Sequence, residues 1–267
     1  MTFSSRIQCN DGKIIFMDKT IDRTILVRQK GHHRWLTFNN DFFQSIINLK
    51  HLAFPMLNYI PHLCFPLSKH QLEKTLICGI AGGAIIHFIQ QYFPSQVLTL
   101  VEIDEVLIEI AKPYFLIETP ILHQNAINYV VNSPVIDHII LDIFVDKNLP
   151  ESLLQASFLR MCRAKARQTV SINLLCHSYP ELISAVKTVR AQFGDQTICI
   201  IVDNHSNVIC HGYSEKVQLS QQIEQALAET RINKPIWHPQ LGTIVSLKKT
   251  QVYPTIKQFF TQVMPFE

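Results

Sequence analysis

Apolar and polar positions along this chain follow one spacing near the beginning and another from about residue 40 onward. Three early runs alternate in the manner of β-strands, and they lie at residues 13–18, 24–29 and 33–38. Together they predict a small antiparallel β module. From Asp41 the apolar residues recur at helical spacing, which predicts a helix over residues 42–49.

The chain beyond residue 70 begins with a strand, a glycine-rich turn, a helix and a second strand. Residues 76–78 form an apolar run typical of a buried strand, and three glycines follow within five positions. The next segment has a broad apolar face and ends before Pro94, as a helix would, and residues 97–101 form another apolar strand. This order predicts a βαβ unit.

Strand-like and helix-like segments continue to alternate through the middle of the chain. They are a helix at 105–115, a short strand at 120–123, a helix at 126–131, a strand at 135–143, a helix at 150–162 and a strand at 169–174. Such alternation is typical of a parallel sheet with helices on its faces.

The later segments favour one kind of α/β fold. Residues 197–202 and 207–211 are β-rich runs joined by the turn-forming residues 203–206, which predicts an antiparallel hairpin, and a helix is expected at 218–229. Dinucleotide-binding Rossmann folds usually continue with parallel strands, whereas the class I methyltransferase fold ends with a reversed strand. We therefore expect an α/β, Rossmann-like class I methyltransferase sheet with a terminal antiparallel hairpin, preceded by a small N-terminal β domain.

The expected domain boundary lies near residue 70. Pro55, Pro61 and Pro66 interrupt any long helix between the β module and the parallel sheet. The expected parts are an N-terminal β module with its linker at residues 1–70 and a Rossmann-like catalytic domain at residues 71–267.

The glycine turn and the acid after the second strand indicate a nucleoside site. Glycines let a ligand approach the backbone closely, and N–H groups at the start of the following helix can face its polar groups. Glu102 ends the next strand, where an acid can accept hydrogen bonds from ribose hydroxyls. The turn lacks the G-x-G-x-x-G pattern, so a plain tight turn is the alternative for the glycines alone. The expected cofactor-binding residues of this unit are Gly79, Ala81, Gly82, Gly83 and Glu102.

Two further positions follow predicted strands at the same edge of the sheet. Asp142 comes after the apolar run 139–141 and would reach the crevice where ligands bind, where it could take a proton from an amine or orient it. The alternative is a helix cap or a loop acid, for which Asp146 is as good a candidate. Asn125 could contact an adenine edge or simply cap the helix that follows it.

The composition narrows the classes of function and partner. The chain has 267 residues, 47% of them hydrophobic, and a net charge of +3 without a basic block, so we expect no nucleic-acid or membrane partner. None of the seven cysteines forms a Cys-x-x-Cys pair, which favours buried thiols over disulfides. The histidines lack metal-ligand spacing, so no metal is expected. The first residues lack the apolar stretch of a secretory signal, and we expect a cytoplasmic protein.

The segment from Gly79 to Asp104 resembles the spermidine synthase-like aminopropyltransferases, a family with the class I methyltransferase fold. The family's hallmark is a Gly-Gly-Gly-Asp-Gly-Gly turn and a helix, followed by Val-Glu-Ile-Asp, and this chain matches it without a gap. The segments VEIDEVLIEIAKPYF, IILDIF and FLRMCRAKARQTVSINLL resemble later family elements. The likeness covers about residues 40–180, and the β module resembles the small N-terminal domain that helps to cover the active site in these enzymes.

The resemblance implies a reaction and roles for particular residues. Gly79, Gly82 and Gly83 would cradle the nucleoside, Glu102 would bind the ribose, and Asp142 would be the base for the attacking amine. The implied reaction transfers an aminopropyl group from decarboxylated S-adenosylmethionine to an amine such as putrescine and releases methylthioadenosine, without a metal. The implied partner is thus a small-molecule amine, and a homodimer is left open.

The chain departs from the family's pattern at several positions. Gly82 stands where the family has an acid that contacts the aminopropyl end of the cofactor, and Asn125 stands where an acid often reads adenine. Gln44 resembles a motif of a less characterised bacterial branch, and with Tyr59 and Asp146 it is an expected substrate-binding residue. The departures leave two alternatives open: an S-adenosylmethionine-dependent methyltransferase with an unknown acceptor, or a non-catalytic member that binds a nucleoside.

Overall fold

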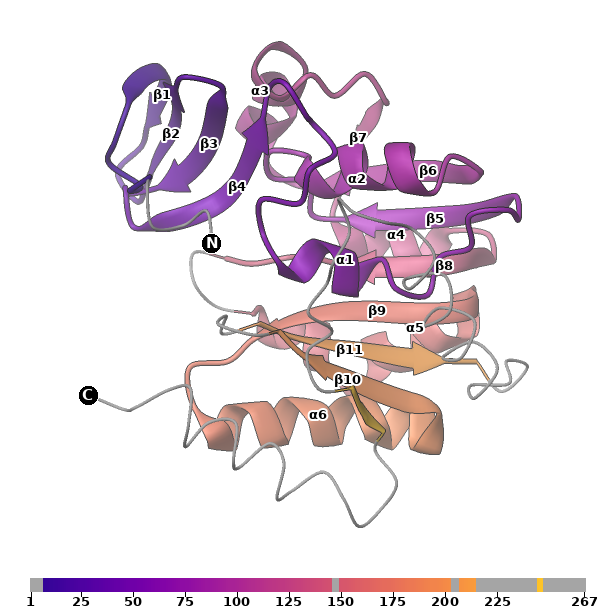
Figure 1. The fold of residues 1–267 in the computed structure, drawn as a ribbon. Coiled ribbons are helices and arrows are strands. Elements are labelled where there is room, and N and C mark those ends of the chain that lie inside the picture. The colour runs from indigo at the N-terminus through magenta and orange to yellow at the C-terminus, as the bar shows by residue number, and fades with distance from the viewer. Residues whose placement is uncertain (1–6, 146–148, 203–206, 215–243, 247–267) are drawn as a thin grey trace.

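The computed structural model describes residues 7–145, 149–202, 207–214 and 244–246 (Figure 1). Two sheets organise this part of the chain, a four-stranded sheet at the beginning and an eight-stranded sheet after it. The first is an antiparallel meander, which confirms the β-strands predicted there. Its strands are β1 (Lys13–Lys19), β2 (Thr24–Lys30), β3 (His33–Phe38) and β4 (Phe42–Asn48).

Strand β4 lies where we predicted a helix, and that prediction is wrong. Asn39 and Asn40 both have positive φ angles, and the tight turn that they form leads the chain back along β3. Both faces of β4 are covered, since Ile46 packs beside Trp35 in a small cluster whereas Ile47 belongs to a larger core. Because apolar side chains are needed on both faces, the strand shows no clear alternation and its apolar residues fall at helical spacing.

The large sheet has the strand order β12-β10-β11-β9-β8-β5-β6-β7. Strands β5 to β9 pair in parallel, whereas β11 runs antiparallel to both β9 and β10. This arrangement confirms the predicted class I methyltransferase-like sheet with its reversed strand, while the predicted turn at 203–206 lies outside the described residues. The strands are β5 (Glu73–Cys78), β6 (Gln96–Glu102), β7 (Ile121–His123), β8 (Ile136–Leu141), β9 (Ala166–Leu175), β10 (Thr197–Ile201), β11 (Asn207–Tyr213) and β12 (Ile244–Ser246).

Helices cover both faces of the large sheet and enclose two apolar cores. Helices α1, α2 and α3 contribute to one core, and α4, α5 and α6 contribute to the other. Neighbouring strand residues alternate between the cores, as Ile77 and Cys78 of β5 do. The helix predicted at 218–229 lies outside the described residues. The helices are α1 (Tyr59–Leu63), α2 (Ala84–Tyr92), α3 (Glu105–Phe115), α4 (Ala126–Asn132), α5 (Ala156–Lys165) and α6 (Tyr179–Phe193), with 3₁₀ turns at Glu151–Leu154 and Gly194–Gln196.

The small sheet packs beside α2 and α3 (Figure 1). Its residue Ile47 belongs to the same apolar core as these two helices. Polar contacts join the two parts as well, since Arg34 donates a hydrogen bond to the Tyr114 carbonyl oxygen at 2.5 Å and Arg23 pairs with Asp104. The division into domains at residue 70 stays a prediction. No helix in the described part of the chain is long and apolar enough to cross a membrane.

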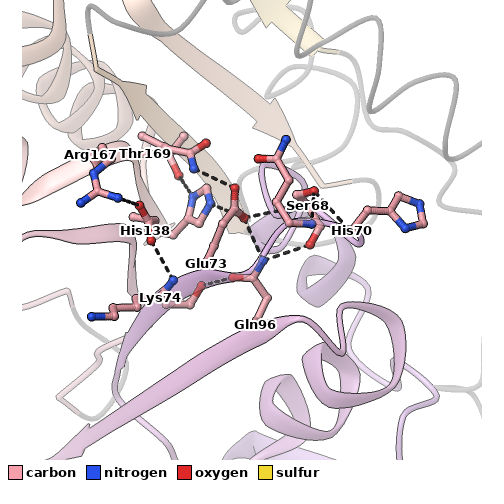
Figure 2. A network of polar contacts seen from close by, with 12 residues as sticks. Ser68, His70, Glu73, Lys74, Gln96, His138, Arg167 and Thr169 are labelled. Carbon is pink, nitrogen blue, oxygen red and sulfur yellow. Dashed lines mark hydrogen bonds and ion pairs between the residues drawn. The ribbon is translucent and has the colours of Figure 1, made fainter.

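A buried polar network lies near the amino-terminal ends of the parallel strands (Figure 2). The Glu73 carboxylate of β5 accepts hydrogen bonds from Gln96 of β6 at 2.8 Å and Gln168 of β9 at 2.7 Å. It also lies 3.0 Å from one ring nitrogen of His138 in β8, whose other nitrogen lies 2.7 Å from the Thr169 hydroxyl. Burial raises the pKa of Glu73, but these hydrogen bonds and the charge of His138 outweigh burial and lower the pKa to about 2. The network therefore links the amino-terminal ends of four strands, β5, β6, β8 and β9.

Candidate active site

Residues predicted for the site come together at the opposite, carboxyl-terminal edge of the sheet. Gly79 follows β5, Glu102 ends β6, Asn125 follows β7 and Asp142 follows β8. Because these strands are parallel, their carboxyl ends lie side by side. The Asp142 N–H donates to the Cys78 carbonyl oxygen at 2.9 Å and so ties the loop after β8 to the end of β5.

The glycine turn has a backbone that only small residues allow. Gly79, Ala81 and Gly83 have φ angles of 87°, 46° and 68°. A Cβ atom at Gly79 would lie 2.2 Å from the Asp142 carbonyl oxygen, and one at Gly83 would lie 2.4 Å from the Ile117 side chain. The turn therefore packs directly against the backbone of Asp142, so that the predicted nucleoside cradle and the predicted base are neighbours.

Glu102 holds the glycine turn and the end of β6 together. Its carboxylate accepts hydrogen bonds from the N–H groups of Ile80 at 2.8 Å, Ile103 at 2.8 Å and Asp104 at 3.1 Å. The side chain is buried. A carboxylate has about four lone-pair positions, so three backbone donors leave one for a ribose hydroxyl. The ribose-binding role of Glu102 stays a prediction, and the geometry gives this side chain a structural role as well.

Asp142 is held by two side chains from distant parts of the chain. The Asn173 amide donates to its Oδ1 at 2.8 Å, and the Tyr59 hydroxyl of α1 donates to its Oδ2 at 3.3 Å. Burial raises the pKa of Asp142 from 3.8 to about 6, although the hydrogen bonds from Asn173 and Tyr59 act in the opposite direction. A carboxyl group with this pKa is ionised at neutral pH and still basic enough to accept a proton.

The sequence-based prediction of the site did not include two asparagines that the structure places there. Asn173 is fully buried in β9 and contacts Asp142, and Asn207 at the start of β11 donates to the Asn173 side-chain oxygen at 2.9 Å. A signal for Asn173 was present in the sequence: Thr169 and Ser171 precede it at alternate positions of a strand with neighbours on both sides. Strands in the middle of a parallel sheet are usually apolar throughout, so alternating polar residues mark a face that binds polar groups.

The other predicted positions differ in how far the structure describes them. The Asn125 side chain accepts hydrogen bonds from the N–H groups of Ile127 at 2.9 Å and Asn128 at 3.3 Å, so it does cap α4. Its contact with adenine stays a prediction. Asp146 lies outside the described residues. Among the residues that are described, no group of three His, Cys, Asp or Glu side chains could hold a metal ion.

The small sheet reaches the glycine turn through Ser45 of β4. A Cβ atom at Gly82 would lie 2.7 Å from the Cβ of Ser45 and 2.8 Å from the Phe115 ring, so these side chains fill the space beside the turn. Ser45 pairs with Leu36 of β3 and Phe43 pairs with Thr37, so the backbone of Gln44 is a bulge in β4 without a partner residue in β3. Its side-chain nitrogen is buried and has no hydrogen-bond partner among the described residues. An unpaired buried amide of this kind can bind a ligand's oxygen or nitrogen acceptor.

Comparisons with known proteins agree with this architecture. No protein-family model matches the chain. A polyamine aminopropyltransferase of Vibrio vulnificus is 25% identical over 173 residues, which are 59% of this chain and 57% of that protein. The chain spans about half the length of the curated relatives that it matches.

Solved structures show the same fold. A probable spermidine synthase of Corynebacterium glutamicum has a TM-score of 0.67 at 16% identity and matches 80% of this chain and 87% of its own. A spermidine synthase in complex with the transition-state analogue AdoDATO has a TM-score of 0.59 at 15% identity, with 84% of this chain and 80% of its own covered. A cytoplasmic location and a homodimer stay predictions. The chain is similar in sequence to polyamine aminopropyltransferases and has the class I methyltransferase-like fold of the spermidine synthases.

Proposed function

We propose that this chain is a spermidine synthase-like transferase that moves an aminopropyl group from decarboxylated S-adenosylmethionine to a small amine such as putrescine. The observation that carries the proposal is the placement of Asp142. Its half-buried carboxyl group has a pKa of about 6 and lies beside the glycine turn at the carboxyl-terminal edge of the sheet. A base held next to a nucleoside cradle is the arrangement that an amine nucleophile requires.

The donor would bind along the glycine turn and Glu102. Glu102 has one acceptor position left for a ribose hydroxyl, and Gln44 offers a buried amide without a partner. The solved spermidine synthase that contains AdoDATO supports a nucleoside-type donor for this fold. Ile103, which follows Glu102, has an exposed apolar side chain that could pack on an adenine ring.

In the proposed reaction, the lone pair of the amine nitrogen attacks the methylene carbon next to the sulfonium of the donor. A carbon–nitrogen bond forms, the carbon–sulfur pair returns to sulfur, and methylthioadenosine leaves. The proton that the amine must lose goes to the carboxylate of Asp142. Tyr59 and Asn173 donate to that carboxylate from two directions and so fix its orientation. The positive charge on sulfur already makes the thioether a good leaving group. The chain therefore needs only to position the donor and the amine and to remove a proton from the amine.

Donor binding tests this proposal. Isothermal titration with decarboxylated S-adenosylmethionine and with S-adenosylmethionine, each at pH 7.5, gives the order of the two affinities. The proposal expects the decarboxylated donor to bind at least about tenfold more tightly, a difference of about 1.4 kcal/mol. The reverse order rejects aminopropyl transfer.

Methyl transfer from S-adenosylmethionine is the second candidate, and one observation favours it. Ser45 and Phe115 occupy the space into which a side chain at Gly82 would extend. In the family that this chain resembles, the corresponding position carries an acid that contacts the aminopropyl end of the cofactor. A chain without that acid has lost one attraction for a cationic aminopropyl group. Tighter binding of S-adenosylmethionine, with product formed only when a methyl acceptor is present, would support this candidate. Nucleoside binding without any turnover would indicate a non-catalytic member.

A further inference from the structure

Strand β11 runs opposite to its neighbours β9 and β10 in the large sheet, and its direction places its first residue at the candidate site. Asn207 begins β11 and lies opposite Leu175, the last residue of β9. Strands β8 and β9 end at this same edge. A parallel strand in the position of β11 would bring its last residue here instead. The antiparallel direction therefore delivers Asn207 to the edge that carries Asp142.

The sheet also sets which face Asn207 occupies. Asn173 lies opposite Ile209, and Asn207 precedes Ile209 by two residues, so both asparagines are on one face of neighbouring strands. Ile209 belongs to the same core as α1, the helix that carries Tyr59. The diagonal spacing lets the Asn207 amide reach the Asn173 side-chain oxygen at 2.9 Å.

This contact decides how the Asn173 amide is oriented. An asparagine side chain has a donor end and an acceptor end, and Asn173 turns its donor end toward Asp142 at 2.8 Å. If the amide turned over, its oxygen would face the Asp142 carboxylate, and two acceptors would meet. Asn173 is fully buried, so bulk water cannot replace a lost partner. Asn207 satisfies the acceptor end and thereby favours the orientation in which Asn173 donates.

We propose that Asn207 is a positioning residue that acts through Asn173 and keeps the Asn173 amide donating to the carboxylate of Asp142. The inference rests on the proposed function in so far as Asp142 is the base. The carboxylate then has one donor fixed by the sheet and a second, Tyr59, supplied by α1. Loss of Asn207 leaves the Asp142 side chain in place and weakens the hydrogen bond that favours its ionised form.

The test is a titration of the Asp142 carboxyl carbon by NMR in protein labelled with ¹³C-aspartate, with the signal assigned by its loss in Asp142→Asn. The midpoint in the unaltered chain is expected near pH 6. In Asn207→Ala it moves upward by about half a unit to one unit, and in Asn173→Ala by at least as much. In the double variant Asn207→Ala/Asn173→Ala it equals the midpoint of Asn173→Ala alone, because Asn207 acts only through Asn173.

Two further variants separate positioning from a general loss of structure. Asn132→Ala removes another side-chain hydrogen bond, which the Asn132 amide donates to the Asn128 carbonyl oxygen at 2.8 Å on the exposed end of α4, and it leaves the midpoint unchanged. Asn207→Asp removes the donor and adds a negative charge, so it raises the midpoint more than Asn207→Ala does. The inference is overturned if Asn207→Ala and Asn207→Asp leave the midpoint where it is, or if Asn132→Ala shifts it equally.

The NMR titration needs no substrate, so its result and the proposed function can fail separately. If Asn207→Ala shifts the Asp142 midpoint but the protein converts no amine, the positioning role of Asn207 is supported and the proposed transferase activity is rejected. If the protein is an active transferase but Asn207→Ala leaves the Asp142 midpoint unchanged, the activity is supported and the positioning role is rejected. Where turnover is present, the acidic limb of kcat/KM moves upward with the NMR midpoint in Asn207→Ala, which a purely structural role would not cause.

Discussion

Gly82 lies so close to Ser45 that a Cβ atom on the glycine would be 2.7 Å from the Cβ of the serine. Ser45 belongs to β4 of the small sheet, whereas Gly82 lies in the turn that follows β5 of the large sheet. The Phe115 ring closes the same space at 2.8 Å. The position at which the resembling family has an acid is thus filled from two sides, so an acid there would have to displace Ser45 or Phe115.

The substitution Gly82→Asp is therefore expected to destabilise the fold and not to improve binding of decarboxylated S-adenosylmethionine. Overpacking of a filled site costs about 1–3 kcal/mol, which urea unfolding measures as a lower midpoint. The double variant Gly82→Asp/Ser45→Gly should recover part of the loss, because one of the two obstructing side chains is removed. An unfolding midpoint of Gly82→Asp equal to that of the original chain would show that the space is open.

Glu102 is expected to decide the affinity for the nucleoside. In Glu102→Gln, one carboxylate oxygen and the negative charge are lost, while three backbone N–H groups still require acceptors. We expect methylthioadenosine to bind about 10 to 100 times more weakly in calorimetric titration. Glu105→Gln is the control, since Glu105 is exposed in the first turn of α3. Equal effects of the two substitutions would contradict a specific role for Glu102.

The pH dependence of turnover should follow the ionisation of Asp142. Burial raises the pKa of this carboxyl group to about 6, so Asp142 is protonated below that pH and is an ionised base above it. We expect kcat/KM to rise as the pH increases through about 6 and then to level off.

Asp137 provides a control for this profile. Its carboxylate accepts hydrogen bonds from the Lys74 N–H and the Arg167 side chain, both at 2.9 Å, near the other edge of the sheet. The variant Asp137→Asn should keep the acidic limb near pH 6. If the acidic limb of the kcat/KM profile disappears in Asp137→Asn, or persists in the residual turnover of Asp142→Asn, the limb reports the ionisation of a group other than Asp142.

Much of the parallel sheet could be predicted from the sequence, because β5, β6 and β8 each end in a largely apolar run that leads directly to a glycine or an acid. The same pattern places Gly79, Glu102 and Asp142 at one edge. The strand β4 could not be predicted, because its two covered faces remove the alternation on which a strand prediction depends. Contacts over long separations were also out of reach, since nothing in the local sequence joins Asn207 to Asn173.

The buried network around Glu73 should make stability depend on pH in the acid range. Its pKa in the folded chain is about 2, below the ordinary value of 4.5, so the folded form gains stability above about pH 4.5 and loses it as the pH falls toward 2. The full difference corresponds to about 3 kcal/mol. Glu73→Gln should therefore be much less stable than the original chain at pH 7, and the gap should shrink below pH 4.5 and nearly close only below about pH 2, as measured by urea unfolding.

A matched control for Glu73 is Glu118, which is exposed and pairs with Lys112 at 3.0 Å. Exposed ion pairs contribute little to stability, so Glu118→Gln should change the unfolding midpoint only slightly at any pH. A constant gap between Glu73→Gln and the original chain from pH 7 to pH 3 would mean that the carboxylate of Glu73 is not the group whose ionisation stabilises the fold.

Turnover with a defined donor and acceptor tests the central claim most directly. The purified chain is mixed with decarboxylated S-adenosylmethionine and putrescine at pH 7.5, and spermidine and methylthioadenosine are quantified by chromatography. The account predicts equal amounts of the two products and a rate that falls by about 10² or more in Asp142→Asn. Failure to form either product, or an unchanged rate in Asp142→Asn, would contradict it.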